Sequence, residues 1–176
     1  MMQDPNLFRE PQPDTLADLY RQIDRRAEWL YALHAARMQC RRGCCGCCED
    51  GLTVFEVEAR NIRRHHADLL AKGTPHAEGA CAFLDGEGAC RIYPHRPYVC
   101  RTQGLPLRWI EPLPDGSFAE LRDICPLNEE GPPVESLPAE ACWRIGPFEE
   151  ALAGLQAAAD GGRMRRAPLR GLFRRA

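Results

Sequence analysis

The chain has 176 residues, of which 44% are hydrophobic and 27% charged, and its formal net charge is -2 at pH 7. These values are typical of one soluble globular domain with a modest core. There is no apolar run of about 18 residues, and the N-terminus lacks a basic patch followed by an apolar stretch, so neither a membrane span nor export is predicted. We therefore expect a cytoplasmic protein.

The 10 cysteines are the unusual part of this composition. The cytoplasm keeps most thiols reduced, so metal ligation is favoured over a disulfide framework. The charge is also uneven, because six arginines and no acidic residue occupy positions 163–176. The rest of the chain is therefore clearly acidic.

An irregular segment and a long helix are predicted before the first cysteine. Residues 1–13 contain three prolines and little apolar periodicity, which indicates an irregular arm. Asp14 is placed to cap the helix that follows. The apolar stripe of this helix consists of Leu16, Leu19, Tyr20, Ile23, Ala27, Leu30, Ala32 and Leu33. The helix leads to Cys40, after which Gly43 and Gly46 disfavour helix and indicate a tight ligand loop.

A second helix is predicted over residues 54–72. Thr53 and Glu56 fit the Ser/Thr-x-x-Glu capping box at its start, and Gly73 is a suitable residue to end it. Glu58 lies within this helix, where we expect a solvated carboxylate.

Two hairpins and a short helical turn are predicted in the middle of the chain. Residues 81–93 form the first hairpin around the turn at 85–88, which brings Cys81 and Cys90 towards each other across its strands. Pro97 is placed at the first position of a helical turn that carries Cys100. A second hairpin pairs residues 105–110 with 117–121.

The C-terminal part is predicted to begin with a loop, because residues 126–138 contain four prolines. Two helical segments, 139–145 and 147–159, are expected next. The tail at 161–176 is expected to be disordered, and its arginines over 163–175 can contact RNA, an anionic surface or an acidic partner. These arginines are Arg163, Arg165, Arg166, Arg170, Arg174 and Arg175.

Together these elements predict an α+β fold: a small, mainly helical single domain with short hairpins and loops organised around a cysteine-rich metal site. We expect this domain to cover residues 14–160.

The densest cysteine pattern is the run from 40 to 48, which places five cysteines in nine residues with the spacing C-x3-C-x2-C-C and an additional cysteine at 45. Thiolates bind zinc, iron and iron-sulfur clusters well, and ligands close in sequence converge with little loop-closure entropy. Chance packing does not explain such a run. The candidate metal ligands are Cys40, Cys44, Cys47, Cys48, Cys81, Cys90, Cys100 and Cys125.

These thiolates exceed the four that one tetrahedral metal or one cubane cluster accepts. The sequence therefore predicts either two centres or some cysteines that only line the site. Cys45 and Cys142 are better explained as buried or incidental thiols, and Cys125 fits either role. The single dense run differs from the paired C-x2-C knuckles of structural zinc sites, which favours iron, with zinc as the alternative.

The run, together with the sequences CAFL at 81–84, CRIY at 90–93 and RPYVCR at 96–101, resembles the YkgJ-type cysteine-cluster family, which is described as zinc- or iron-chelating. The resemblance covers residues 40–102. It implies metal ligation by the matching cysteines, namely Cys40, Cys44, Cys47, Cys48, Cys81, Cys90 and Cys100.

Polar residues near the cysteines are secondary candidates. Arg96 and Arg101 flank Cys100 and are candidate cofactor-binding residues, since guanidinium groups can offset the charge of a thiolate cluster or donate hydrogen bonds to sulfur. An ordinary salt bridge explains them equally well. His65 and His66 are adjacent, so on one helix they point in different directions and do not easily share a metal. His95 is the best candidate among the histidines, because it lies between two cysteines.

The predicted function is metal binding through clustered thiolates, holding an iron-sulfur cluster, iron or Zn2+ for electron transfer, metal handling or a structural role beside a protein partner. One alternative is a small metal-dependent oxidoreductase or an accessory enzyme of protein modification, although a stand-alone enzyme is less favoured. The other alternative is a thiol redox switch.

Overall fold

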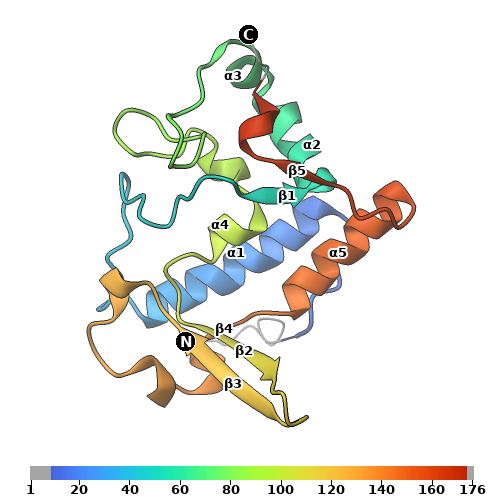
Figure 1. Ribbon diagram of the computed structural model, residues 1–176. Helices are drawn as coiled ribbons and strands as arrows, with labels where there is room; N and C mark the ends of the chain where they lie inside the picture. Colours follow the sequence, from blue (N-terminus) through green and yellow to red (C-terminus); the bar gives the residue numbers. More distant parts are fainter. Residues whose placement is uncertain (1–8, 174–176) are drawn as a thin grey trace. The chain divides into compact units, whose positions relative to one another are not determined.

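The computed structural model describes residues 9–173, and the chain divides into two compact units (Figure 1). Unit 1 consists of the described part of Met1–Cys40 together with Arg101–Leu152. Unit 2 consists of Arg41–Cys100 and the described part of Ala153–Ala176. The boundaries of the single domain over 14–160 stay a prediction. Within residues 9–173, no helix is long and apolar enough to cross a membrane.

Unit 1 contains the long helix α1 (Leu16–Leu33) and a three-stranded sheet. The N-cap of α1 is Thr15, whose side chain accepts a hydrogen bond from the Asp18 amide, so the predicted cap was one residue early. Leu19, Ile23 and Leu30 of its apolar stripe are fully buried. Residues 9–13, the described part of the predicted arm, contain neither helix nor strand, and residues 1–8 lie outside the described residues.

The sheet of unit 1 has the strand order β3-β2-β4. Strands β2 (Leu107–Pro112) and β3 (Phe118–Asp123) form the predicted second hairpin, with Leu107 opposite Asp123. Strand β4 (Trp143–Arg144) runs parallel to β2. The helix predicted over 139–145 is therefore a single 3-10 turn, η4 (Ala139–Ala141), followed by a strand, because the Trp143 amide bonds to the Pro106 carbonyl.

The proline-rich loop over residues 126–138 contains two further 3-10 turns, η2 (Pro126–Asn128) and η3 (Val134–Ser136). The loop is followed at some distance by helix α5 (Pro147–Asp160), which agrees closely with the helix predicted at 147–159.

Unit 2 contains helices α2 (Glu56–His65), α3 (Ala67–Lys72) and α4 (Tyr98–Arg101, whose last residue belongs to unit 1), and the 3-10 turns η1 (Tyr93–His95) and η5 (Arg170–Leu172). Strand β1 (Thr53–Phe55) pairs antiparallel with β5 (Arg166–Pro168).

The predicted capping box is wrong, because Thr53 belongs to β1 and α2 begins only at Glu56. The acceptor for the first turn comes from a distant segment, since the Gln156 side chain accepts a hydrogen bond from the Val57 amide at 2.9 Å. Gln156 is fully buried. The single helix predicted over 54–72 is also interrupted, because His66 separates α2 from α3.

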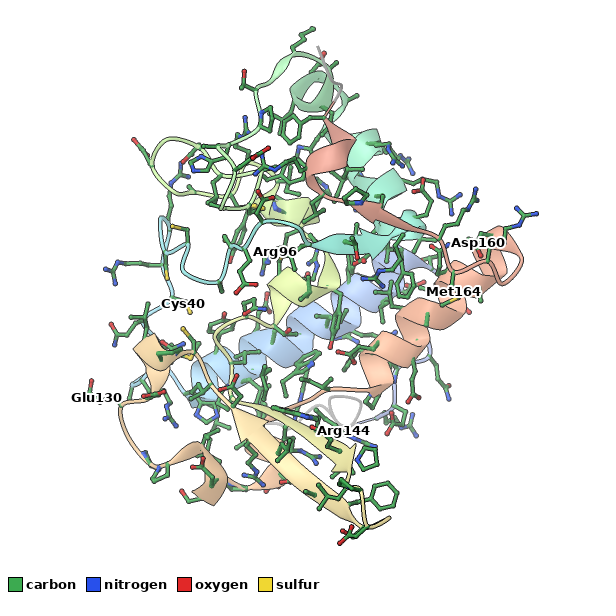
Figure 2. All side chains as sticks on the ribbon, viewed as in Figure 1. Cys40, Arg96, Glu130, Arg144, Asp160 and Met164 are labelled. Carbon is green, nitrogen blue, oxygen red and sulfur yellow. The ribbon has the colours of Figure 1, made fainter. Side chains whose placement is uncertain are left out.

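The prediction of a disordered tail is wrong for residues 166–173. Strand β5 pairs antiparallel with β1, and Leu169, Leu172 and Phe173 are buried in the core of unit 2. Asp160 directs the chain from α5 to β5, because its buried carboxylate accepts hydrogen bonds from the Met164 and Arg165 amides (Figure 2). Residues 174–176 lie outside the described residues.

Three of the tail arginines make contacts inside unit 2. Arg165 lies 3.6 Å from the Asp160 carboxylate, Arg166 donates to the Thr53 carbonyl, and Arg170 binds the Asp50 carboxylate. Contact of this segment with RNA or an anionic surface stays a prediction.

Candidate metal centre

Four cysteines of unit 2 lie in or against its hydrophobic core. Cys81 is part of this core, and Cys45, Cys48 and Cys90 pack against it. The core is built by Val54, Ala59, Ile62, Leu70, Ala82, Phe83, Leu84, Ile92, Ala167, Leu169, Leu172 and Phe173. The apolar core therefore fixes the backbone around Cys45, Cys48, Cys81 and Cys90.

The cysteine run folds as consecutive turns rather than as a helix. The Cys44 amide donates to the Arg41 carbonyl, and the Cys48 amide donates to the Cys45 carbonyl. The Cys48 carbonyl in turn accepts a hydrogen bond from the Cys81 amide at 2.8 Å. This last bond joins the backbone of the run directly to that of the first downstream cysteine.

A glycine lets the run approach the turn before Cys90. Gly88 has a φ of +76°, and a Cβ atom placed on it would lie 3.1 Å from the Gly43 carbonyl oxygen and 3.3 Å from the Cys45 sulfur. The turn itself is closed by Asp85, whose carboxylate accepts hydrogen bonds from the Glu87 and Ala89 amides. Close backbone approach therefore requires glycine at this position.

The hairpin predicted over 81–93 is reduced to a tight turn with one isolated antiparallel bridge, between Leu84 and Cys90. Burial raises the pKa of Cys90, and repulsion from the Cys81 thiolate adds to this effect. The approach of Cys81 and Cys90 as shared ligands stays a prediction.

Cys100 lies in α4, which begins where the sequence predicted a helical turn. Glu58 caps this helix, since its carboxylate accepts a hydrogen bond from the Tyr98 amide at 2.8 Å. The expectation of a solvated Glu58 is wrong, because its side chain is only 3% exposed. A buried carboxylate is tolerated where hydrogen bonds compensate the lost hydration, so Glu58 fixes the backbone that carries Cys100.

Four thiols of unit 2 form an electrostatically coupled cluster. Burial, followed by repulsion from the Cys81 and Cys90 thiolates, raises the pKa of Cys100 to about 12. The pKa of Cys48 is raised by its hydrogen bond with Cys47, by burial and by repulsion from neighbouring thiolates that include Cys81 and Cys100. Such crowding disfavours four free thiolates, whereas a bound cation would neutralise their charge.

Cys47 behaves differently from its neighbour. Its pKa is lowered, chiefly because the Cys48 thiol donates a hydrogen bond to the Cys47 thiolate. The more acidic Cys47 is exposed, whereas Cys48 is half-buried.

We define the thiol cluster as Cys47, Cys48, Cys81, Cys90 and Cys100. Its donor chemistry suits zinc, iron or an iron-sulfur centre, and it contains the four thiolates that a tetrahedral site needs. Across residues 9–173, however, no three Cys, His, Asp or Glu side chains already converge as ligands of one metal ion. The cluster is therefore a gathered set of donors rather than a closed coordination shell.

The remaining cysteines of unit 2 lie in the turns of the run. Cys44 and Cys45 are both half-buried, and Cys45 packs against the core. This packing agrees with the interpretation of Cys45 as a thiol that lines the site.

Unit 1 contains Cys40, Cys125 and Cys142. The sulfur of Cys40 accepts a 3.5 Å hydrogen bond from the side-chain amide of Asn128, in turn η2. Asn128 is fully buried, and its amide also donates to the Gly104 carbonyl. Cys125 belongs to the same turn, because its carbonyl accepts a hydrogen bond from the Asn128 backbone amide.

Cys142 is 1% exposed, and burial raises its pKa. The nearest cation is Arg122, whose guanidinium lies 4.0 Å from the sulfur. This environment agrees with its interpretation as a buried thiol of the core.

The two candidate cofactor-binding arginines have different surroundings. Arg96 stacks on the Tyr93 ring, donates to the Cys100 carbonyl at 3.2 Å, and tends to lower the pKa of the Cys100 thiol. Arg101 is 3% exposed, forms two hydrogen bonds with the Asp24 carboxylate and lies over the Tyr20 ring. A role next to a cofactor stays a prediction for both.

Sequence reasoning missed Glu58 and Asn128. The carboxylate of Glu58 caps the helix that carries Cys100 by accepting from the Tyr98 amide, 40 residues away in sequence. Asn128 donates to the Cys40 sulfur from 88 residues away. Neither contact has a local sequence signal. The only hint for Asn128 is its position three residues after Cys125, where a short Pro-containing turn points it inwards.

These observations define an α+β protein that gathers cysteine thiols at the edge of a small core. The model of the CxxCxxCC family, described as "Putative zinc- or iron-chelating domain", matches residues 39–126. The chain belongs to this family, since the match covers half of its length. Comparison with curated proteins and with solved structures gave no match.

Proposed function

We propose that the protein binds iron, as an iron-sulfur cluster, through its clustered cysteines, with zinc as the alternative metal, and that it serves electron transfer, metal handling or a structural role for a protein partner in the cytoplasm. The observation that carries the proposal is the thiol cluster itself. Cys48, Cys81 and Cys90 lie in or against the unit 2 core. The pKa of Cys48 is raised by its hydrogen bond with Cys47, by burial and by repulsion from neighbouring thiolates, and the pKa of Cys100 is raised by burial and by repulsion from the Cys81 and Cys90 thiolates.

Cys48, Cys81, Cys90 and Cys100 are the proposed ligands of one four-thiolate centre. Each of these thiols interacts electrostatically with at least one other member, and a hydrogen bond joins the backbones of Cys48 and Cys81. Cys47 is the proposed exchangeable ligand, because it is exposed and its pKa is lowered. Cys40, Cys44 and Cys125 are proposed as further ligands.

A bound metal would contribute thiolate neutralisation and, for an iron-sulfur cluster, reversible one-electron chemistry. The residues around it have supporting roles. Glu58 holds the helix that carries Cys100, and Asp85 closes the turn that precedes Cys90. Since the core of unit 2 is small, ligand binding should supply on the order of 10 kcal/mol of folding free energy.

The test is purification without oxygen, followed by metal analysis and a visible spectrum. The expected result is stoichiometric iron with sulfide and a broad sulfur-to-iron charge-transfer absorption. Stoichiometric zinc in a colourless protein would contradict the iron version and support the zinc version. A fully folded protein without bound metal would contradict both.

Neighbouring cysteines of the run provide a matched pair of variants. Cys48→Ser removes a proposed ligand, and we expect it to lower both the metal content and the unfolding midpoint. Cys45→Ser removes a thiol that packs against the core, and we expect it to keep the metal content of the wild type. Equal metal content in the two variants would contradict the assignment.

A further inference from the structure

Three histidines of unit 2 meet outside the thiol cluster. The Nε2 atom of His66 lies 3.0 Å from the Nδ1 atom of His95, at hydrogen-bonding distance. The ring of His65 stacks on the ring of His95, with 3.9 Å between centroids and 7° between ring planes. The sequence predicted that His65 and His66 would point in different directions, because neighbouring side chains diverge on one continuous helix.

The interruption of the helix explains why the histidines meet. His65 is the last residue of α2, and His66 has φ -129° and ψ 32°, which places it outside both α2 and α3. The backbone change turns both rings towards His95, which ends η1. The three residues thus come from two segments that are packed against each other in one unit.

The His66–His95 pair has the geometry of a metal ligand pair. In the hydrogen bond, one ring nitrogen donates a proton to the lone pair of the other. A tautomer shift moves that proton to the second nitrogen of the same ring, which leaves two lone pairs facing each other and releases no net proton. Two nitrogens bound to a tetrahedral ion at 2.0–2.1 Å lie about 3.4 Å apart, and the ion lies off the line that joins them. The pair therefore needs to open by a few tenths of an ångström, and both rings need to turn so that their lone pairs meet at the ion.

His65 is not a third ligand in this arrangement. An ion bound to a ring nitrogen lies in the plane of that ring, and the His65 ring lies in a parallel plane above His95. His65 therefore packs the pair, and water completes the coordination. A pair of nitrogens, rather than three converging ligands, also agrees with the finding that within residues 9–173 no three such side chains converge on one point.

The pair is accessible from solvent, since His66 and His95 are half-buried and His65 is exposed. Burial, followed by the nearby charge of His65, lowers the pKa of His66, which favours the neutral form of its ring. Neutral imidazole is the form that binds Zn2+, Ni2+ and Cu2+.

We propose that His66 Nε2 and His95 Nδ1 form a second metal site, an open two-nitrogen site for a divalent ion such as Zn2+, distinct from the thiol cluster. Two protein ligands leave the remaining positions of the ion to water, so the ion exchanges readily. His95 lies on the segment that joins Cys90 to Cys100, which places exchangeable metal on the same chain segment as two proposed thiolate ligands. Only this last link rests on the proposed function, because the histidine site itself is independent of the cysteines.

The test is calorimetric titration of the full chain, as isolated with its cysteine-bound metal, with Zn2+ near pH 7. We expect one additional zinc equivalent, with binding weakened about tenfold or more in His66→Gln and in His95→Gln. His76→Gln serves as the control and should keep the affinity within about twofold. Cysteine-bound metal, measured separately, should be equal in all four proteins.

Nitrogen-15 NMR of the wild type supplies a second measurement that needs no variant. Zinc should shift the His66 Nε2 and His95 Nδ1 resonances and leave those of His76 unchanged. The absence of an additional equivalent, unchanged affinity in His66→Gln, or equal weakening in His76→Gln would overturn the histidine site. None of these results affects the thiol cluster, whose failure would appear as loss of the metal present at isolation.

Discussion

Replacement of Gly104 by alanine tests how unit 1 positions Cys40. Gly104 has a φ of +89°, and a Cβ atom on it would lie 2.5 Å from the Cys40 sulfur and 3.2 Å from the side-chain nitrogen of Asn128. The left-handed backbone costs alanine roughly 1–2 kcal/mol. Overpacking adds about 1–3 kcal/mol, with the lower value applying if the sulfur rotates away and gives up its hydrogen bond from Asn128.

Gly116 is the matched control, because it has a similar φ of +83° but nothing within 4 Å of its Cβ position. Urea unfolding of Gly104→Ala and Gly116→Ala therefore separates the backbone strain, common to both, from the crowding of Cys40. We expect Gly104→Ala to lose about 1–3 kcal/mol more than Gly116→Ala.

The same comparison of Gly104→Ala with Gly116→Ala in a Cys40→Ala background shows whether the Cys40 sulfur is the atom that crowds the new Cβ. Removal of the sulfur takes away the shorter of the two contacts, so the excess loss in Gly104→Ala should shrink. Metal content is measured beside stability, and Gly104→Ala should retain less metal than Gly116→Ala. Equal destabilisation by the two alanines, or an excess that persists without the sulfur, would refute the reasoning.

Three further substitutions address the other supporting contacts. Glu58→Ala removes the acceptor of the Tyr98 amide and should cost about 1–3 kcal/mol in urea unfolding, whereas Glu58→Gln, which keeps an acceptor, should cost clearly less; equal losses would contradict the capping role. Hydrogen bonds from the Arg165 amide and other donors lower the pKa of Asp160 in the folded protein below its unfolded value of 3.8. Asp160 therefore stabilises the fold above pH 3.8, and this stabilisation is lost as the pH falls through the lower folded-state pKa. Asp160→Asn should remove this part of the dependence of the unfolding free energy on pH. An unchanged slope of unfolding free energy against pH would contradict this. Arg170→Lys keeps the charge but should lower the unfolding midpoint, with the exposed Arg163→Lys as an unaffected control.

Local signals predicted the elements that depend on neighbouring residues. The apolar stripe of α1, the turn chemistry between β2 and β3, and the start of α4 after Pro97 are all set within a few residues, and the structure confirms them. The prediction of a capping box at Thr53 was wrong because Val54 pairs with Ala167 in the β1–β5 sheet, so residues 53–55 form a strand and not a helix start. No local sequence pattern reveals this contact. Long-range pairing overrode the local preference at this position.

The prediction of a disordered tail was wrong for a related reason. Arginines dominate the composition of the tail, but Leu169, Leu172 and Phe173 provide enough apolar surface to join the core once β5 is paired.

For the metal centre, the cysteines alone allow candidate ligands to be predicted from the sequence, both in the run and downstream of it. The contacts that support them are less visible, because Glu58 and Asn128 are ordinary residues until the fold brings them to a backbone amide or a sulfur.

Arg170 belongs to the tail and supports the candidate metal centre. It lies outside residues 39–126, yet it holds the two loops that carry Cys48 and Cys81. Its guanidinium binds the carboxylate of Asp50, two residues after Cys48, and donates to the Ala80 carbonyl, directly before Cys81. It also donates to the carbonyls of His76 and Ala77. A planar fork with five donors can serve this many acceptors, whereas the ammonium of lysine has three donors at one point. The loss expected in Arg170→Lys should therefore be accompanied by weaker metal retention, because the loops that carry Cys48 and Cys81 would lose their common brace.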